Sequence, residues 1–340
     1  MISTQIRDNL AFFTVMANSD LWKEFRKYMY QGKKTGNWYT WKGTGSIAAF
    51  HGYLSLMIEK PTLKHTKNSM VWACQNGDLD MVKFLHHKGT ECCPAVMDRA
   101  AANGYLEIVQ FLHENRPEGC TQQAMNCASK NGHLEVVKWL HFNRAEGCTA
   151  WAMDAAALMG HLDIVIFLHK GNKGCTSVAM DCAAKNGHLE VVKWLHFNRT
   201  EGCTDWAMDY AAETGNLEVV KWLHFNRTEG CTYRAMDRAS KNGHLELVKW
   251  LHFNKEEGCT HYAMDHASRN GHLDVVKYLH EKNKDCTTFA MDSASEEGHL
   301  DVVKWLHENR KEGCTFLAGE LSEKRGNVKV LEWLHQVGLA

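Results

Sequence analysis

The chain of 340 residues is dominated by one short phrase that recurs along most of its length. One copy runs from Met208 to His224 and reads Met-Asp-Tyr-Ala-Ala-Glu-Thr-Gly-Asn-Leu-Glu-Val-Val-Lys-Trp-Leu-His. A fixed period of 27 or 28 residues predicts a solenoid of stacked units, each contacting only its neighbours. A glycine at the same place marks the copies: Gly77, Gly104, Gly132, Gly160, Gly187, Gly215, Gly243, Gly271, Gly298 and Gly326.

Each copy contains the signals for two helices. Thr204 precedes an apolar run and is a suitable N-cap, because its hydroxyl can accept a hydrogen bond from a free backbone N–H. Alanines and a methionine with a spacing of three to four then predict a first helix over 205–213. Gly215 is expected to end it in a left-handed conformation. A second apolar stripe predicts a helix over 216–226, and no run alternates with period two, so no strand is expected.

This order of residues resembles a divergent ankyrin repeat. The family pattern is matched by residues 180–195, Met-Asp-Cys-Ala-Ala-Lys-Asn-Gly-His-Leu-Glu-Val-Val-Lys-Trp-Leu. The resemblance is strong over residues 70–340 and weak over Ser46–Ile58. It implies an all-α, ankyrin-type solenoid of about eleven stacked helix pairs in residues 45–340, whose first unit is degenerate and whose last unit is a C-terminal cap. Residues 1–44 would be an N-terminal helical cap region.

The chain departs from the family pattern in two ways. The family period is longer, and the missing residues fall between the second helix and the next unit, which implies truncated inter-repeat loops and no substantial β-sheet. Trp206-Ala-Met-Asp209 stands where the family has Thr-Pro-Leu-His, which leaves the start of the first helix open. This short form resembles arrays expanded in protists and giant viruses. The resemblance implies a non-catalytic scaffold or adaptor without a cofactor, and with a protein partner rather than a small-molecule substrate.

Composition narrows the classes of function. A net charge of -1 gives no global attraction to nucleic acid, and no stretch approaches the ~18 apolar residues of a membrane span. The apolar run 10–17 follows Asp8, which disfavours a signal peptide, although secretion stays an alternative. The sequons at Asn198 and Asn226 belong to the repeated phrase and are interpreted as accidents of it. We expect a cytoplasmic, monomeric protein, or one in a host cytoplasm if it is a secreted effector.

Cysteine and histidine each form a column that invites a zinc interpretation. Equivalent residues of stacked helices lie about 8–10 Å apart, which is too far for one metal or for a disulfide. We therefore expect the cysteines to be small buried hydrophobes, and the histidines to pack at helix ends and bond terminal carbonyls. The columns are Cys92, Cys120, Cys148, Cys175, Cys203, Cys231, Cys259, Cys286 and Cys314, with His86, His113, His141, His169, His196, His224, His252, His280, His307 and His335.

Three positions of the first helix vary between copies: two before, two after and five after the repeat methionine. Their spacing predicts one helix face, which in the ankyrin family lines the concave groove. Large aromatic and arginine side chains there predict a protein-binding groove with a basic step, whereas neutral drift after duplication is the alternative. The candidate groove residues are Trp151, Leu158, Trp206, Tyr210, Glu213, Arg234, Arg238, Lys241, Tyr262, His266, Arg269, Phe289 and Glu296.

The first 44 residues are of another kind and have three interpretations. A terminal cap is expected, because the first repeat of a solenoid needs its apolar side covered. Asp20-Leu-Trp22 resembles the end of an F-box helix, which would make the protein a substrate adaptor for ubiquitin ligation. Lys33 and Lys34 near Trp38 and Trp41 could instead contact nucleic acid or a membrane surface, although nucleic acid is not the expected partner.

Overall fold

The computed structural model describes residues 54, 57 and 63–340, and it divides the chain into two units, 1–91 and 92–340. The described part of the first unit contains one helix pair, α5 (Lys67–Asn76) and α6 (Leu79–His87). The predicted cap region 1–44 and most of the weak unit Ser46–Ile58 lie outside the described residues.

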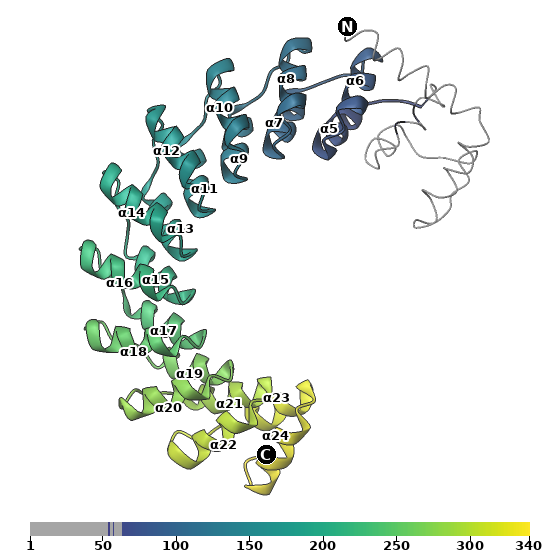
Figure 1. Cartoon of the computed structure of the whole chain (residues 1–340). Helices are drawn as coiled ribbons and strands as arrows, with labels where there is room; N and C mark the ends of the chain where they lie inside the picture. The colour runs from purple at the N-terminus through teal and green to yellow at the C-terminus, as the bar shows by residue number, and fades with distance from the viewer. Residues whose placement is uncertain (1–53, 55–56, 58–62) are drawn as a thin grey trace, which may run out of the picture. The chain divides into compact units, whose positions relative to one another are not determined.

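The second unit consists of nine further helix pairs, drawn in Figure 1. Within the described residues there is no β-strand, which confirms the expected all-α fold with short inter-repeat loops. The first helices of the pairs are α7 (Pro94–Ala102), α9 (Gln122–Lys130), α11 (Ala150–Leu158), α13 (Ser177–Lys185), α15 (Trp206–Glu213), α17 (Tyr233–Lys241), α19 (Tyr262–Arg269), α21 (Thr288–Glu297) and α23 (Leu317–Arg325). The second helices are α8 (Leu106–Asn115), α10 (Leu134–Asn143), α12 (Leu162–Lys170), α14 (Leu189–Asn198), α16 (Leu217–Asn226), α18 (Leu245–Asn254), α20 (Leu273–Glu281), α22 (Leu300–Asn309) and α24 (Val328–Gln336).

The core of the second unit lies between the two rows of helices. In the pair α15–α16, Ala211 and Met208 are buried on the first helix, and Val219, Val220 and Leu223 are buried on the second. Because small alanines allow close approach, neighbouring first helices pack extensively, whereas neighbouring second helices touch little. The row of first helices therefore lies on the inner side of the bend within this unit (Figure 1).

Both ends of the first helix carry the predicted residues, although α15 begins at Trp206, one residue later than expected, with Asp205 in place of Thr204 as its N-cap. The hydroxyl of Thr232 accepts a hydrogen bond from the N–H of Arg234 at 3.1 Å and caps α17. Gly215 has φ +77° after α15, a left-handed conformation that costs glycine nothing. The predicted surface pairs also form, since Lys221 lies 2.9 Å from Glu218 and Lys193 lies 2.8 Å from Glu190.

A buried aspartate settles how the first helix starts without the family's Thr-Pro-Leu-His. The carboxylate of Asp209 accepts a hydrogen bond from the N–H of Thr232 at 2.9 Å and a second from its hydroxyl at 2.7 Å. Thr232 is the N-cap of the next unit's first helix, so Asp209 fixes the start of the following repeat. The same two hydrogen bonds, donated by the threonine of the next repeat, are accepted by Asp98, Asp154, Asp181, Asp237, Asp265 and Asp292.

Because Asp209 is buried, the stability that it contributes depends on pH, and it decreases as the pH rises. Burial raises the pKa of Asp209, and the two bonds from Thr232 oppose that rise. A native pKa above the unfolded value of about 3.9 means that the folded state binds the proton more tightly. The free energy of unfolding contributed by Asp209 is then greatest below about pH 3.9 and decreases as pH rises through the native pKa.

We therefore expect wild type to lose stability relative to Asp209→Asn as pH rises from about 4 to 7, because the amide does not ionise. Urea denaturation of both proteins at matched pH values, followed by circular dichroism, measures the difference. A gap between the two proteins that stays constant over this range, or widens in favour of wild type, would contradict the assignment.

Within the part of the chain that the structure describes, no helix is long and apolar enough to cross a membrane.

Candidate protein-binding face

The candidate groove residues all come from the first helices α11 to α21, but they differ in exposure. The position two before the methionine is open to solvent, whereas the other two positions are half-buried in every candidate residue except Lys241. The exposed members are Trp151, Trp206, Arg234, Lys241, Tyr262 and Phe289. The half-buried members are Leu158, Tyr210, Glu213, Arg238, His266, Arg269 and Glu296.

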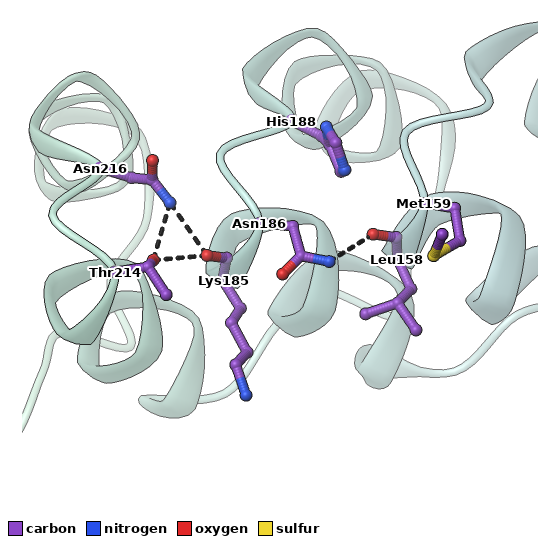
Figure 2. A pocket seen from close by; sticks show the side chains of 7 residues that line it. All are labelled: Leu158, Met159, Lys185, Asn186, His188, Thr214 and Asn216. Carbon is purple, nitrogen blue, oxygen red and sulfur yellow. Dashed lines mark hydrogen bonds between the residues drawn. The ribbon is translucent and has the colours of Figure 1, made fainter.

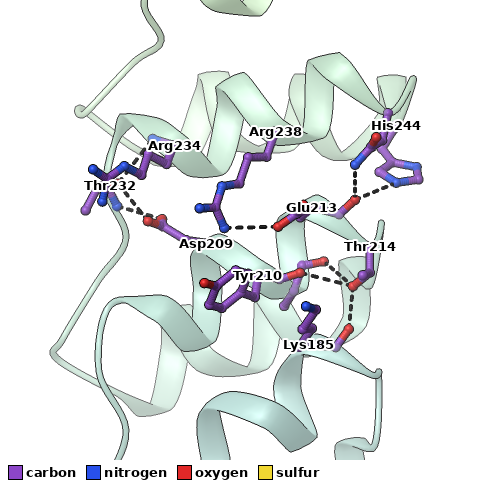
Figure 3. A network of polar contacts seen from close by, with 11 residues as sticks. Lys185, Asp209, Tyr210, Glu213, Thr214, Thr232, Arg234, Arg238 and His244 are labelled. Atoms are coloured by element: carbon purple, nitrogen blue, oxygen red, sulfur yellow. Dashed lines mark hydrogen bonds and ion pairs between the residues drawn. The ribbon is translucent and has the colours of Figure 1, made fainter. Parts of the chain in front are cut away.

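Tyr210 lies at the centre of a network that joins three repeats, shown in Figure 3. The ammonium of Lys185, on the preceding repeat, lies 4.9 Å from the centre of its ring. The guanidinium of Arg238, on the following repeat, lies 4.6 Å from the same ring, and Trp206 meets it edge-on at 5.7 Å. Cations over an aromatic face are attracted by its quadrupole. Tyr210 therefore links neighbouring repeats as well as lining the face.

Aromatic contacts also join the repeats nearer the carboxyl end. His266 stacks on Tyr262 of its own helix with ring centres 5.6 Å apart. Its other neighbour is Phe289 of the next repeat, which it meets edge-on at 5.8 Å. The exposed aromatic side chains of α19 and α21 are thus held in place before any partner arrives, which lowers the entropy lost on binding.

The predicted basic step is weaker than the sequence indicates. The guanidinium of Arg238 lies 3.0 Å from the carboxylate of Glu213, one repeat earlier. Likewise, Arg269 lies 3.2 Å from Glu297 of the next repeat. Because both arginines already have carboxylate partners, the net positive charge of this face rests mainly on Arg234 and Lys241. Sequence reasoning missed these pairs because the partners lie 25 and 28 residues away.

The carboxyl-terminal ends of the first helices α11, α13 and α15, with the turns that follow them, line a shallow depression of about 520 Å³, shown in Figure 2. The side-chain amide of Asn186 donates to the carbonyl of Leu158 at 2.6 Å. One repeat later, Asn216 donates to the carbonyl of Lys185 at 2.9 Å, and Thr214 donates to the same carbonyl at 2.5 Å. These donors are occupied in joining adjacent repeats, so the polar lining is part of the scaffold.

The histidine column is structural, but by a different contact from the one expected. Nδ1 of His196 lies 3.3 Å from the guanidinium of Arg227 in the next repeat, and its ring meets Trp222 edge-on at 5.1 Å. Arginine can only donate, so in this contact the ring nitrogen is the acceptor. The expectation of bonds to terminal carbonyls is therefore wrong for this contact, which recurs at His113, His169 and His280.

The cysteine column lies at the junction between repeats, where five members are buried and four are half-buried. Burial raises the pKa of the Cys203 and Cys231 thiols to about 12 each. A thiol with such a pKa stays protonated at neutral pH and is a poor nucleophile and metal ligand. No group of three or more potential metal ligands occurs among the residues that the structure describes.

One exposed feature escaped the sequence analysis. Four phenylalanines lie at the ends of second helices and project away from the core: Phe142, Phe197, Phe225 and Phe253. Each directly follows the column histidine and falls outside the buried stripe of its helix. The signal was a large apolar residue on the polar side of an amphipathic pattern.

Comparison with known proteins places the repeats in one family. Family models described as ankyrin repeats match residues 70–150, 97–181 and 235–317, and others match residues 180–224 and 208–252. A comparison with the curated proteins found no significant match. The matches extend over most of the described repeats and agree with the stacked helix pairs. The chain therefore belongs to the ankyrin repeat family.

Proposed function

We propose that this protein is a non-catalytic scaffold that binds a protein partner through the exposed face of its first helices. Ankyrin repeats are generally protein–protein interaction modules. The observation that carries the proposal is the row of exposed Trp151, Trp206, Tyr262 and Phe289 on successive or alternate first helices. Aromatic side chains that stay exposed in the free protein are typical anchors of interfaces.

The chemistry of the row indicates the kind of partner. Trp206 is 53% exposed, so more than half of its surface is available for burial by a ligand. Arg234 lies between the aromatic groups of α15 and α19 and supplies a positive charge there. We therefore propose a partner with apolar side chains and an acidic group that faces Arg234.

The cysteine content supports a cytoplasmic location for this scaffold.

Two finer roles rest on the sequence alone. An adaptor for ubiquitin ligation would use residues 1–44, which lie outside the described residues. A host-directed effector role follows only from the resemblance to arrays of protists and giant viruses. Binding of purified ligase components to the full chain, and loss of that binding on deletion of residues 1–44, would support the adaptor role.

Affinity capture with the full chain and two matched variants tests the binding face. We expect Trp206→Ser combined with Tyr262→Ser to reduce capture of specific partners at least tenfold, because both side chains would be buried in the complex. The control variant combines Phe197→Ser with Phe225→Ser, which makes the same kind of change at the exposed phenylalanines of the second helices. This variant should leave the amount of captured partner unaltered. The proposal would be overturned if the Trp206→Ser, Tyr262→Ser variant still captured the specific partners and the Phe197→Ser, Phe225→Ser variant did not.

Stability must stay nearly constant for that comparison to be valid. Trp206 and Tyr262 are exposed, so thermal melting of the serine variant should differ little from wild type. Tyr210 is unsuitable for this purpose, because its ring also packs against Lys185 and Arg238 of the neighbouring repeats. Loss of Tyr210 would weaken stability and binding together.

A further inference from the structure

The exposed phenylalanines of the second helices form an apolar row outside the proposed binding face. Phe197, Phe225 and Phe253 are each 73–74% exposed and end the consecutive second helices α14, α16 and α18. Phe142, on α10, is exposed as well. Single exposed apolar residues are normal on a protein surface, whereas an aligned set marks an interaction site.

Each ring is held by the column histidine that precedes it. The centres of His196 and Phe197 lie 4.8 Å apart, and those of His224 and Phe225 lie 4.9 Å apart, both edge-on. Because His196 is itself fixed by Arg227 and Trp222, the rings start from an ordered position. Little conformational entropy would be lost on burying them.

At the position of the phenylalanines the two ends of this row carry opposite charges, and Lys282, which follows Glu281, lies 5.6 Å from the centre of the Phe253 ring. The equivalent position is Lys170 on α12, one repeat before Phe197, and Glu281 on α20, one repeat after Phe253. Both side chains are exposed, and neither takes part in an ion pair within the described residues. The row therefore reads Lys, Phe, Phe, Phe, Glu at intervals of one repeat.

This order is complementary to itself when it is reversed. A two-fold axis through Phe225 places Phe197 against Phe253 of a second copy and Lys170 against its Glu281. In such an interface every contact occurs twice, so two opposite-charge pairs flank an apolar centre. Two copies aligned in parallel would instead place Lys170 against Lys170. We propose that this row is the contact surface of an antiparallel homodimer.

The second copy fits better than an unrelated partner for a geometric reason. The phenylalanines recur at intervals of one repeat along the row of second helices. Another copy of the chain carries side chains at that same spacing. Three phenylalanines and two charges per copy make a small interface, so the dimer belongs to the weak class below about 1,200 Å². This dimer would replace the monomer expected from the sequence and does not depend on the binding face of the first helices.

Sedimentation equilibrium of the full chain over micromolar to submillimolar concentrations tests the dimer. Wild type should show a concentration-dependent monomer–dimer equilibrium. Phe225→Ser lies on the axis and acts twice, so it should raise the dissociation constant at least tenfold. Phe142→Ser is the matched control, because the axis places Phe142 against Glu308, and it should change the constant less than about threefold.

Charge reversal identifies the antiparallel register. Lys170→Glu alone places two glutamates together and should weaken the dimer about threefold or more at low salt, and Glu281→Lys alone should do the same. Combined, Lys170→Glu and Glu281→Lys restore the opposite-charge pair and should restore the affinity. Circular dichroism melting checks that each variant is folded.

Three results would overturn the proposal. The first is a protein that stays monomeric at every concentration. The second is a dimer that is insensitive to Phe225→Ser, or one in which the double charge reversal gives no rescue. The third is binding of the monomer to phosphatidylcholine–phosphatidylserine vesicles that Phe225→Ser abolishes, since this would assign the row to a membrane surface.

Discussion

Gly215→Ala is expected to destabilise the protein by about 3 kcal/mol or more, through two effects that add. The residue has φ +77°, a conformation that costs an L-residue with a side chain about 1–2 kcal/mol. A Cβ there would also lie 2.7 Å from the ring of His244 on the next repeat. That ring is held by a contact of 3.2 Å between its Nε2 and the carbonyl of Glu213. Urea denaturation followed by circular dichroism measures the loss.

Gly230→Ala separates the two effects, because it shares the conformation without the collision. Gly230 has φ +73°, and a Cβ there would meet only Glu257, at 3.8 Å. We expect this variant to lose about 1–2 kcal/mol. Adding His244→Ala to Gly215→Ala should recover part of the difference. Equal losses from the two glycine variants would show that the His244 ring moves aside at little cost.

The repeat itself predicts most of the fold. Thr232, Gly215 and the buried Met208 and Ala211 act within one unit or through identical neighbours, so local rules suffice to place them. The ankyrin assignment then gives the stacking of the pairs. What the repeat could not supply was the start of the first helix, because the bond that fixes it joins Asp209 to a residue 23 positions later.

The helix face that carries Trp206 and Tyr210 was predicted more closely in position than in burial and charge, and its role in binding stays a prediction. Spacing within one helix placed Trp206 and Tyr210 on a common face, and the structure brings their rings together at 5.7 Å. The half-burial of Tyr210 and the pairing of Arg238 with Glu213 depend on contacts between repeats. Such contacts follow from the superhelical offset of neighbouring units, which periodicity alone does not give.

The two exposed rows also show why amphipathic patterns can hide a surface. The position of Trp206 varies between copies, which is typical of a binding surface, whereas the position of Phe225 repeats in neighbouring copies. Repetition in a solenoid usually marks packing, yet Phe225 is 74% exposed. A repeated residue off the buried stripe cannot be explained by packing, and this distinction separates the phenylalanine row from the cysteine column.

Asp209→Ala is expected to lower the free energy of unfolding by about 2–3 kcal/mol at neutral pH. The change removes both acceptors of Thr232, at 2.9 and 2.7 Å, and a hydrogen bond to a charged group contributes about 1.5–3 kcal/mol net. Burial of the carboxylate raises its pKa and offsets part of the gain. Urea denaturation of the full chain measures the loss.

The chain contains its own control for this prediction. Asn126 occupies the aspartate position in α9. Its side-chain oxygen accepts a hydrogen bond from the N–H of Thr149 at 3.1 Å, and its side-chain amide donates to the hydroxyl of Thr149 at 3.1 Å. Asp209→Asn can adopt the same arrangement, so we expect it to lose less than about 1 kcal/mol. A double-mutant cycle of Asp209→Ala with Thr232→Ala isolates the hydroxyl bond, and a coupling near zero would mean that only the backbone N–H bond joins the two repeats.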